Sequence, residues 1–127
     1  MKEYMLLIRN KGDHVSAMPD EQHQEFLQKC ETYIGNLKRQ GKLIAAQPLL
    51  RQGVVISGST NDWKETPFDA SAEVQVGYYH IRAEDLSEAI DIAKGNPEFV
   101  YGNTASIEVR PVKMKEENTG FEYPKTP

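Results

Sequence analysis

The chain has 127 residues and a formal net charge of −4, from 15 Lys and Arg against 19 Asp and Glu. A single domain typically has about 100–150 residues, so we expect one compact unit. The acidic balance argues against nucleic acid as the main partner, because phosphate binding needs a basic face. The only cysteine, Cys30, excludes an intrachain disulfide framework and a cysteine-rich zinc site. With no apolar run of about 20 residues and no signal peptide, we expect a soluble cytoplasmic protein that makes no membrane contact.

The first third of the chain predicts a strand followed by a long helix. Residues 4–8 form a short apolar run of the kind found in central strands. Pro19 opens a helical pattern that Ser16 or Asp20 could cap, and Gly41 ends it. The expected buried face of this helix consists of Phe26, Cys30, Tyr33, Ile34 and Leu37.

The middle of the chain predicts two β segments and a long loop. Residues 43–50 read as a strand that Pro48 interrupts, which favours an edge position. Residues 53–57 read as a second strand, paired to the first through a hairpin turn at residues 51–53. Residues 58–72 are rich in turn formers, and we expect a loop anchored by Trp63 and Phe68.

The last third predicts a strand, a helix, a strand and a tail. Residues 74–82 are rich in aromatic and β-branched side chains, and residues 84–94 repeat apolar positions at helical spacing. Residues 105–110 alternate between apolar and polar side chains, as a half-buried strand does. We therefore expect a domain over residues 1–113 and a polar, extended or mobile tail over residues 114–127.

The order of these elements predicts an α+β fold of the ferredoxin-like βαβ(ββ)αβ type, with two helices on one face of an antiparallel four-stranded sheet. Two helices cover one face only, yet the strands carry apolar side chains on both. On residues 74–82 we expect Val76 and Tyr78 to point one way, and Tyr79 and Ile81 the other. A second copy of the sheet is the simplest cover, so we expect a two-fold homodimer whose sheets pack face to face.

Several segments, in this order and spacing, resemble the YCII-related proteins, and among them the group named for an Asp-Gly-Pro-Phe motif. The resemblance covers roughly residues 4–112. Its anchors are Met5-Leu6-Leu7-Ile8, Pro19, Gly41-Lys42-Leu43, Pro67-Phe68, Gly77-Tyr78-Tyr79, Leu86-Ser87-Glu88-Ala89, Pro97 and Ile107-Glu108-Val109-Arg110-Pro111. The resemblance implies a dimeric α+β barrel and a ligand cleft between sheet and helices. Most members of the family have no established reaction.

The sequence departs from that group at the motif itself. Glu65-Thr66 stands in place of the Asp-Gly, so the acid is kept and the glycine is lost. After Pro67-Phe68, the acid and the Lys-Glu pair usual in the group are replaced by Ala70 and by Ala72-Glu73. The broader family carries a His–Asp pair proposed as catalytic, and His23 stands on the first helix as that histidine does. The aspartate of that pair is not assigned to a position of this chain.

Two histidines are candidate catalytic residues because an imidazole titrates near neutral pH. His23 lies three residues before Phe26, where it could act as a base or bind an anion, or be a half-exposed residue at a helix start. His80 and Tyr78 are two positions apart on one strand and share a face, so they could line a cleft as a base and a donor. A hydrogen-bonded pair in a dimer interface is the alternative for them.

Charged side chains supply the remaining candidates. Glu65, Asp69 and Glu73 could bind a cationic or hydroxylated ligand beside the aromatic side chains, or be solvated loop acids. They could instead hold a raised pKa for acid–base work, with Glu65 as the candidate catalytic carboxylate. Arg9 and Arg110 end the first and last strands and could together hold a carboxylate, or be surface arginines paired with Glu108 or Asp13.

Three functions remain open from the sequence. The first is a small-molecule-binding homodimer, the second an enzyme using a histidine base with a loop carboxylate, and the third a non-catalytic interaction module. His14, His23 and His80 lack metal-ligand spacing and no glycine-rich phosphate loop is present, so we expect neither metal nor cofactor.

Overall fold

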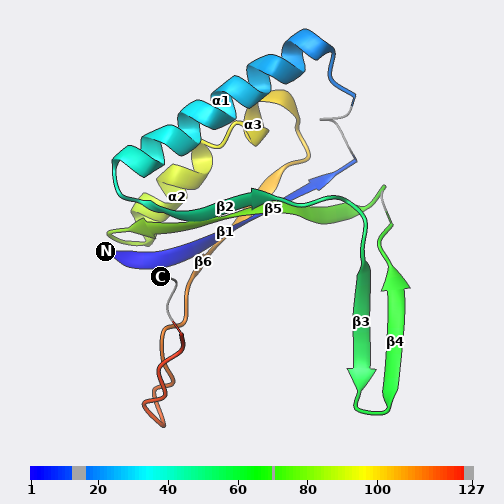
Figure 1. Ribbon diagram of the computed structural model, residues 1–127, viewed down its shortest axis with the longest axis vertical. Coiled ribbons are helices and arrows are strands. Elements are labelled where there is room, and N and C mark those ends of the chain that lie inside the picture. The colour runs from blue at the N-terminus through cyan, green and yellow to red at the C-terminus, as the bar shows by residue number, and fades with distance from the viewer. Residues whose placement is uncertain (13–16, 70, 125–127) are drawn as a thin grey trace.

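The computed structural model describes residues 1–12, 17–69 and 71–124. It shows an α+β fold in which helices cover one face of a four-stranded sheet, and a separate two-stranded hairpin projects from the sheet (Figure 1). The strands are β1 (Lys2–Lys11), β2 (Leu43–Pro48), β3 (Val54–Ser59), β4 (Asp62–Pro67), β5 (Glu73–Ala83) and β6 (Ser106–Pro111). The helices are α1 (Asp20–Arg39), α2 (Leu86–Lys94) and the single turn α3 (Glu98–Tyr101).

The main sheet has the strand order β2-β5-β1-β6, and every neighbouring pair is antiparallel. Each βαβ unit leaves its two strands separated by one strand of the other unit, which is the ferredoxin-like arrangement. The predicted fold class is therefore confirmed. β2 lies at the edge and ends at Pro48, which cannot donate to a further strand.

Side chains alternate between the two faces of the sheet. On β1, Tyr4, Leu6, Ile8 and Asn10 are buried beneath the helices. The other face has no helix over it (Figure 1), and we call it the open face. It includes Glu3, Met5, Leu7 and Arg9 of β1, Ala45 of β2, Tyr78, His80 and Arg82 of β5, and Ser106, Glu108 and Arg110 of β6.

The core lies between the helices and the covered face. Leu6 and Ile81 are fully buried at its centre. The rings of Tyr33 on α1 and Tyr79 on β5 meet edge to face with centroids 5.4 Å apart, and the Tyr33 hydroxyl donates to the Ile92 carbonyl at 2.6 Å. These contacts tie α1 to both the sheet and α2.

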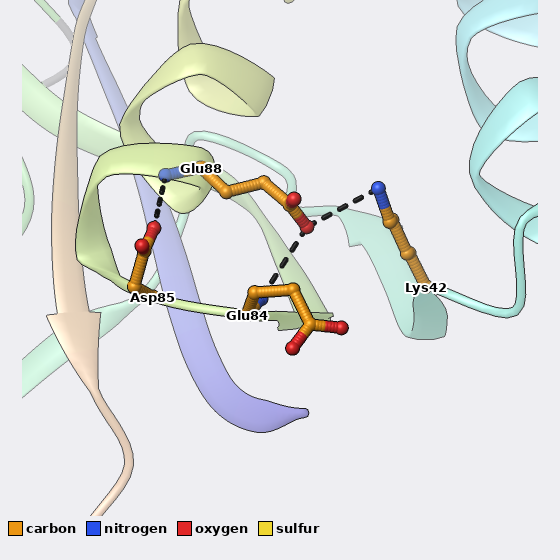
Figure 2. A network of polar contacts seen from close by, with 4 residues as sticks. All are labelled: Lys42, Glu84, Asp85 and Glu88. Carbon is orange, nitrogen blue, oxygen red and sulfur yellow. Dashed lines mark hydrogen bonds and ion pairs between the residues drawn. The ribbon is translucent and has the colours of Figure 1, made fainter.

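Local sequence explains where the helices begin. Pro19 precedes α1 and Asp20 is its first helical residue rather than its cap, while Ser16 lies outside the described residues. Asp85 caps α2, because its carboxylate accepts from the Glu88 amide at 2.9 Å. Figure 2 shows that the Glu88 carboxylate in turn accepts from the Glu84 amide at 3.4 Å and pairs with Lys42 at 3.1 Å.

The hairpin corrects the predicted strand pairing. β3 pairs with β4 and not with β2, and the loop expected over residues 58–72 contains β4. The turn falls at Thr60-Asn61, where Asn61 adopts a φ of 75°, a conformation that asparagine tolerates well. The expected anchors are also wrong: Trp63 is 64% exposed and Phe68 38% exposed.

A bulge corrects the predicted direction of Val76. The register between β1 and β5 shifts at Ile8/Arg9, so that the extra residue on β5 turns Val76 toward the helices, where it packs on the core. Tyr78 faces the other way, as predicted, and Tyr79 and Ile81 face the helices.

The segment that follows β6 folds back on itself. Val112 continues from the sheet by donating to the Glu3 carbonyl at 3.0 Å, and Lys115 and Glu122 then form an isolated antiparallel bridge. The rings of Phe121 and Tyr123 meet edge to face. We call residues 112–123 the C-terminal hairpin. Within the described ranges, no helix is both long enough and apolar enough to cross a membrane.

Candidate functional site

His80 and Tyr78 lie on the open face, in the centre of the sheet. The His80 Nε2 lies 2.7 Å from Oε1 of Glu3, and the two side chains are only 11% and 17% exposed. Tyr78 stands opposite Leu7 on β1, and His80 stands opposite Met5. A carboxylate that orients an imidazole is an arrangement found in general-base catalysis and in interface ion pairs, so this geometry permits either role.

The two arginines also lie on the open face, but the register separates them. β1 and β6 are neighbours, as the prediction required, and their antiparallel pairing places Arg9 opposite Ser106 and Arg110 opposite Met5. This leaves the two residues about 13 Å apart along the strands, at about 3.3 Å per residue. Arg9 instead forms an ion pair with Glu108 at 3.5 Å. The structure does not bring the two guanidinium groups together.

The three candidate acids lie at the Lys11 end of the sheet or beyond it. Glu65 is an exposed residue of β4, and Glu73 begins β5 opposite Lys11. Asp69 accepts from the Ser71 hydroxyl at 2.6 Å and amide at 2.9 Å, and these hydrogen bonds hold the pKa of its carboxyl below the ordinary value. His80 lies seven residues further along β5 than Glu73, so His80 is not close to these three acids within one chain.

The structure places a cavity of about 220 Å³ between α1 and the covered face of the sheet. Its walls are mainly apolar and come from both layers: Phe26, Leu27, Cys30 and Ile34 on α1, and Ala46 and Val76 on the sheet. One larger hollow lies along the outer flank of α1 and another lies between α1 and residues 95–100, and both are more open to solvent. We call the cavity between the layers the inner pocket, and it is less open to solvent than either of these hollows.

The inner pocket continues into a second hollow of about 300 Å³ that shares the walls formed by Phe26, Leu27, Pro48, Val76 and Glu98. This second hollow ends at Asn10 and Arg51. Arg51 donates to the Asn10 side chain and, at 3.0 Å, to the Ala72 carbonyl. The hollow therefore has one apolar end and one polar end.

Two ionisable groups of the inner pocket, Cys30 and Tyr79, are held in their neutral forms. Burial, and secondarily the carboxylate of Glu98, raise the pKa of the Cys30 thiol to about 11. Burial is also the main cause that raises the pKa of the Tyr79 hydroxyl well above its ordinary range. At neutral pH the pocket thus offers a thiol rather than a nucleophilic thiolate.

His23, half-buried on α1, lies one turn before Phe26 and Leu27, which line both the inner pocket and the second hollow. Sequence reasoning placed Cys30 in the core and did not single out Glu98, Arg51 or Asn10. Asn96 is buried, and its Oδ1 accepts from the Glu98 amide at 2.9 Å, which fixes the start of α3 at the pocket wall. In the sequence, the one feature that could have indicated this part of the pocket wall is the proline that follows Asn96.

The described residues contain no group of three or more His, Cys, Asp and Glu side chains that could hold a metal ion. His14, one of the three histidines of the sequence, lies outside them. Two acids of the open face already have partners: Glu3 contacts His80, and Glu108 forms an ion pair with Arg9.

No curated protein matches this chain. The model of the YCII-related domain matches residues 2–113, which span β1 to β6 and include the inner pocket and the open face. This match confirms the resemblance drawn from the short segments of the sequence. The chain belongs to the YCII-related domain family.

Proposed function

We propose that this protein binds an uncharged, mostly apolar small molecule in the inner pocket and acts as a homodimer. The observation that carries the proposal is the partly enclosed pocket of about 220 Å³ with apolar walls from both α1 and the sheet. An apolar cavity of about 150 Å³ accepts benzene. The inner pocket therefore suits a single ring that bears a short substituent.

The electrostatics of the pocket favour a neutral ligand over an anion. Cys30 and Tyr79 stay protonated there because transfer of charge out of water is costly. The Glu98 carboxylate lies close enough to raise the pKa of both groups, so it would also repel a ligand carboxylate. Among ligands of one size, the neutral member of a pair should bind more tightly.

The open face supports the homodimer. Met5, Leu7 and Tyr78 are half-buried in one chain, with no helix above them. Half-buried apolar side chains in the centre of a sheet become fully buried when a second sheet packs against them at about 10 Å. A second copy of the same face satisfies this requirement with a two-fold axis.

The enzyme hypothesis keeps one specific observation in its favour, the contact between His80 and Glu3. In the proposed homodimer this pair would lie between the two sheets, where a substrate bound between the protomers could reach it. The residues that would complete a reaction are not assembled within one chain, so ligand binding is the better supported function.

A thermal-shift experiment tests the proposed function with the matched probes benzyl alcohol and benzoate. We expect benzyl alcohol to raise the melting temperature in a saturable manner and benzoate to have a much smaller effect. The variant Ala46→Leu, which fills the inner pocket, should abolish the response. The control Thr32→Leu changes the outer flank of α1 and should retain it. An equal response of Ala46→Leu and the unchanged protein would rule out the inner pocket as the site.

A further inference from the structure

The hairpin formed by β3 and β4, which we call the arm, has one apolar and one polar face. The register pairs Val54 with Pro67, Ile56 with Glu65 and Gly58 with Trp63, and these side chains share a face. The opposite face carries Val55, Ser57, Ser59, Asp62, Lys64 and Thr66. Glu65 is thus the one charged residue within the apolar face of the arm.

Nothing in the described chain covers this apolar face. Val54 is 54% exposed, Ile56 61% and Trp63 64%, and every residue of β3 and β4 is exposed. An isolated two-stranded ribbon is only marginally stable in water, and a contiguous apolar surface usually marks an interaction site. The arm therefore has the composition of a surface that is buried in an assembly.

The arm and the C-terminal hairpin project from opposite ends of the sheet, on the side without helices (Figure 1). The arm returns to the sheet at Glu73, opposite Lys11 at the end of β1. The C-terminal hairpin leaves the sheet beside Glu3, at the start of β1. It also exposes apolar surface, since Phe121 is 58% exposed.

We propose that the apolar face of each arm packs on the C-terminal hairpin of a second copy of the chain. The proposal rests on the sheet-to-sheet homodimer proposed above. In that dimer, a two-fold axis that lies between the sheets and crosses the strands brings the arm end of one copy over the C-terminal end of the other. From Val54 to Gly58, opposite Trp63, the arm extends about 13 Å, which exceeds the separation of about 10 Å between packed sheets.

Charge selects this arrangement over one in which the two arms lie together. The arm carries Asp62 and Glu65 against Lys64, so two arms side by side would repel each other. The open face at the other end of the sheet carries Arg82 and Arg110, opposite Glu3 and Met5. No ion pair is seen for either arginine among the described residues, and Glu3 is engaged by His80. In the proposed dimer, the arm of one copy lies over this end of the other copy's sheet, so that Glu65 comes close to Arg82 and Arg110.

Trp63 is the only tryptophan, so its fluorescence reports the environment of the arm directly. We expect Trp63 of the dimer to show blue-shifted emission and weak quenching by acrylamide. The variants Phe121→Ser and Glu65→Lys should shift the emission to the red and increase quenching while light scattering still reports a dimer. The control Lys64→Gln lies on the polar face of the arm and should leave both signals unchanged.

The outcomes separate this proposal from the homodimer on which it rests. A dimer in which Trp63 emits and is quenched as in free solvent would overturn the docking of the arm and leave the sheet interface standing. Protected Trp63 that ignores Phe121→Ser and Glu65→Lys would equally overturn it, since the arm would then be buried elsewhere. A monomer by light scattering would remove both proposals.

Discussion

Replacing Ala46 by leucine should stabilise the fold, because the added carbons enter the inner pocket. Leucine is three carbon atoms larger than alanine, and burial contributes about 0.8 kcal/mol per methylene, which gives a gain of about 2 kcal/mol. The inner pocket has a volume of about 220 Å³, more than the roughly 150 Å³ that accepts benzene, so three added carbon atoms have room there.

Urea unfolding measures this gain. With a slope of about 2 kcal/mol per molar, the midpoint should rise by about 1 M. Protein concentration must be equal in all samples, because association would stabilise the folded state. Ala45→Leu is the matched control, since Ala45 pairs with His80 on the open face while Ala46 pairs with Tyr79 beneath the helices. If Ala46→Leu lowers the midpoint, or raises it no more than Ala45→Leu does, the pocket cannot have the described shape.

Three further predictions follow from the fold. Leu7→Glu should give folded monomers by light scattering, because Leu7 lies on the open face, and a folded dimer would reject the sheet interface. Alkylation of Cys30, followed by mass spectrometry, should accelerate up to about pH 11, whereas levelling near pH 9 would show an unburied thiol. Because the unfolded chain loses this proton first, the free energy of unfolding should fall above about pH 9. Asp85→Ala should cost about 1 kcal/mol in chemical denaturation through loss of the α2 cap, and Asp91→Ala, in the interior of α2, serves as its control.

The spacing of apolar residues predicted most elements of the fold, because a helix or strand with one buried face repeats apolar residues at its own period. The apolar spacing from Phe26 to Leu37 located α1, and the alternation over residues 105–110 located β6. Pro48 marked the edge strand for a local reason, its missing amide donor. Each of these signals lies within a single element.

The failures came from interactions between elements. Turn signals at residues 51–53 and 60–62 compete, and only the paired structure shows that the second closes the hairpin. Val76 turned inward because a bulge in β5, at the register shift against β1, broke the period of two. Both errors concern register, which one strand by itself does not specify.

The candidate site was partly visible in the sequence. Tyr78 and His80 share a face, as their spacing implied, but the buried partner of His80 is Glu3, 77 residues away. The sequence did not reveal the inner pocket, because the residues that line it are ordinary core residues of α1 and the sheet. The inner pocket results from the way in which α1 packs on the sheet, and the amino-acid composition does not reveal that packing.

Protection of Cys30 from alkylation is the most direct test of ligand binding in the inner pocket, because this single thiol forms part of its wall. With iodoacetamide at pH 9, rising benzyl alcohol should slow the reaction to a plateau, and benzoate should leave it nearly unchanged. The protection should vanish in Ala46→Leu. The contrary result is an alkylation rate that stays constant at every benzyl alcohol concentration, although the same compound raises the melting temperature. It would show that the ligand binds outside the inner pocket.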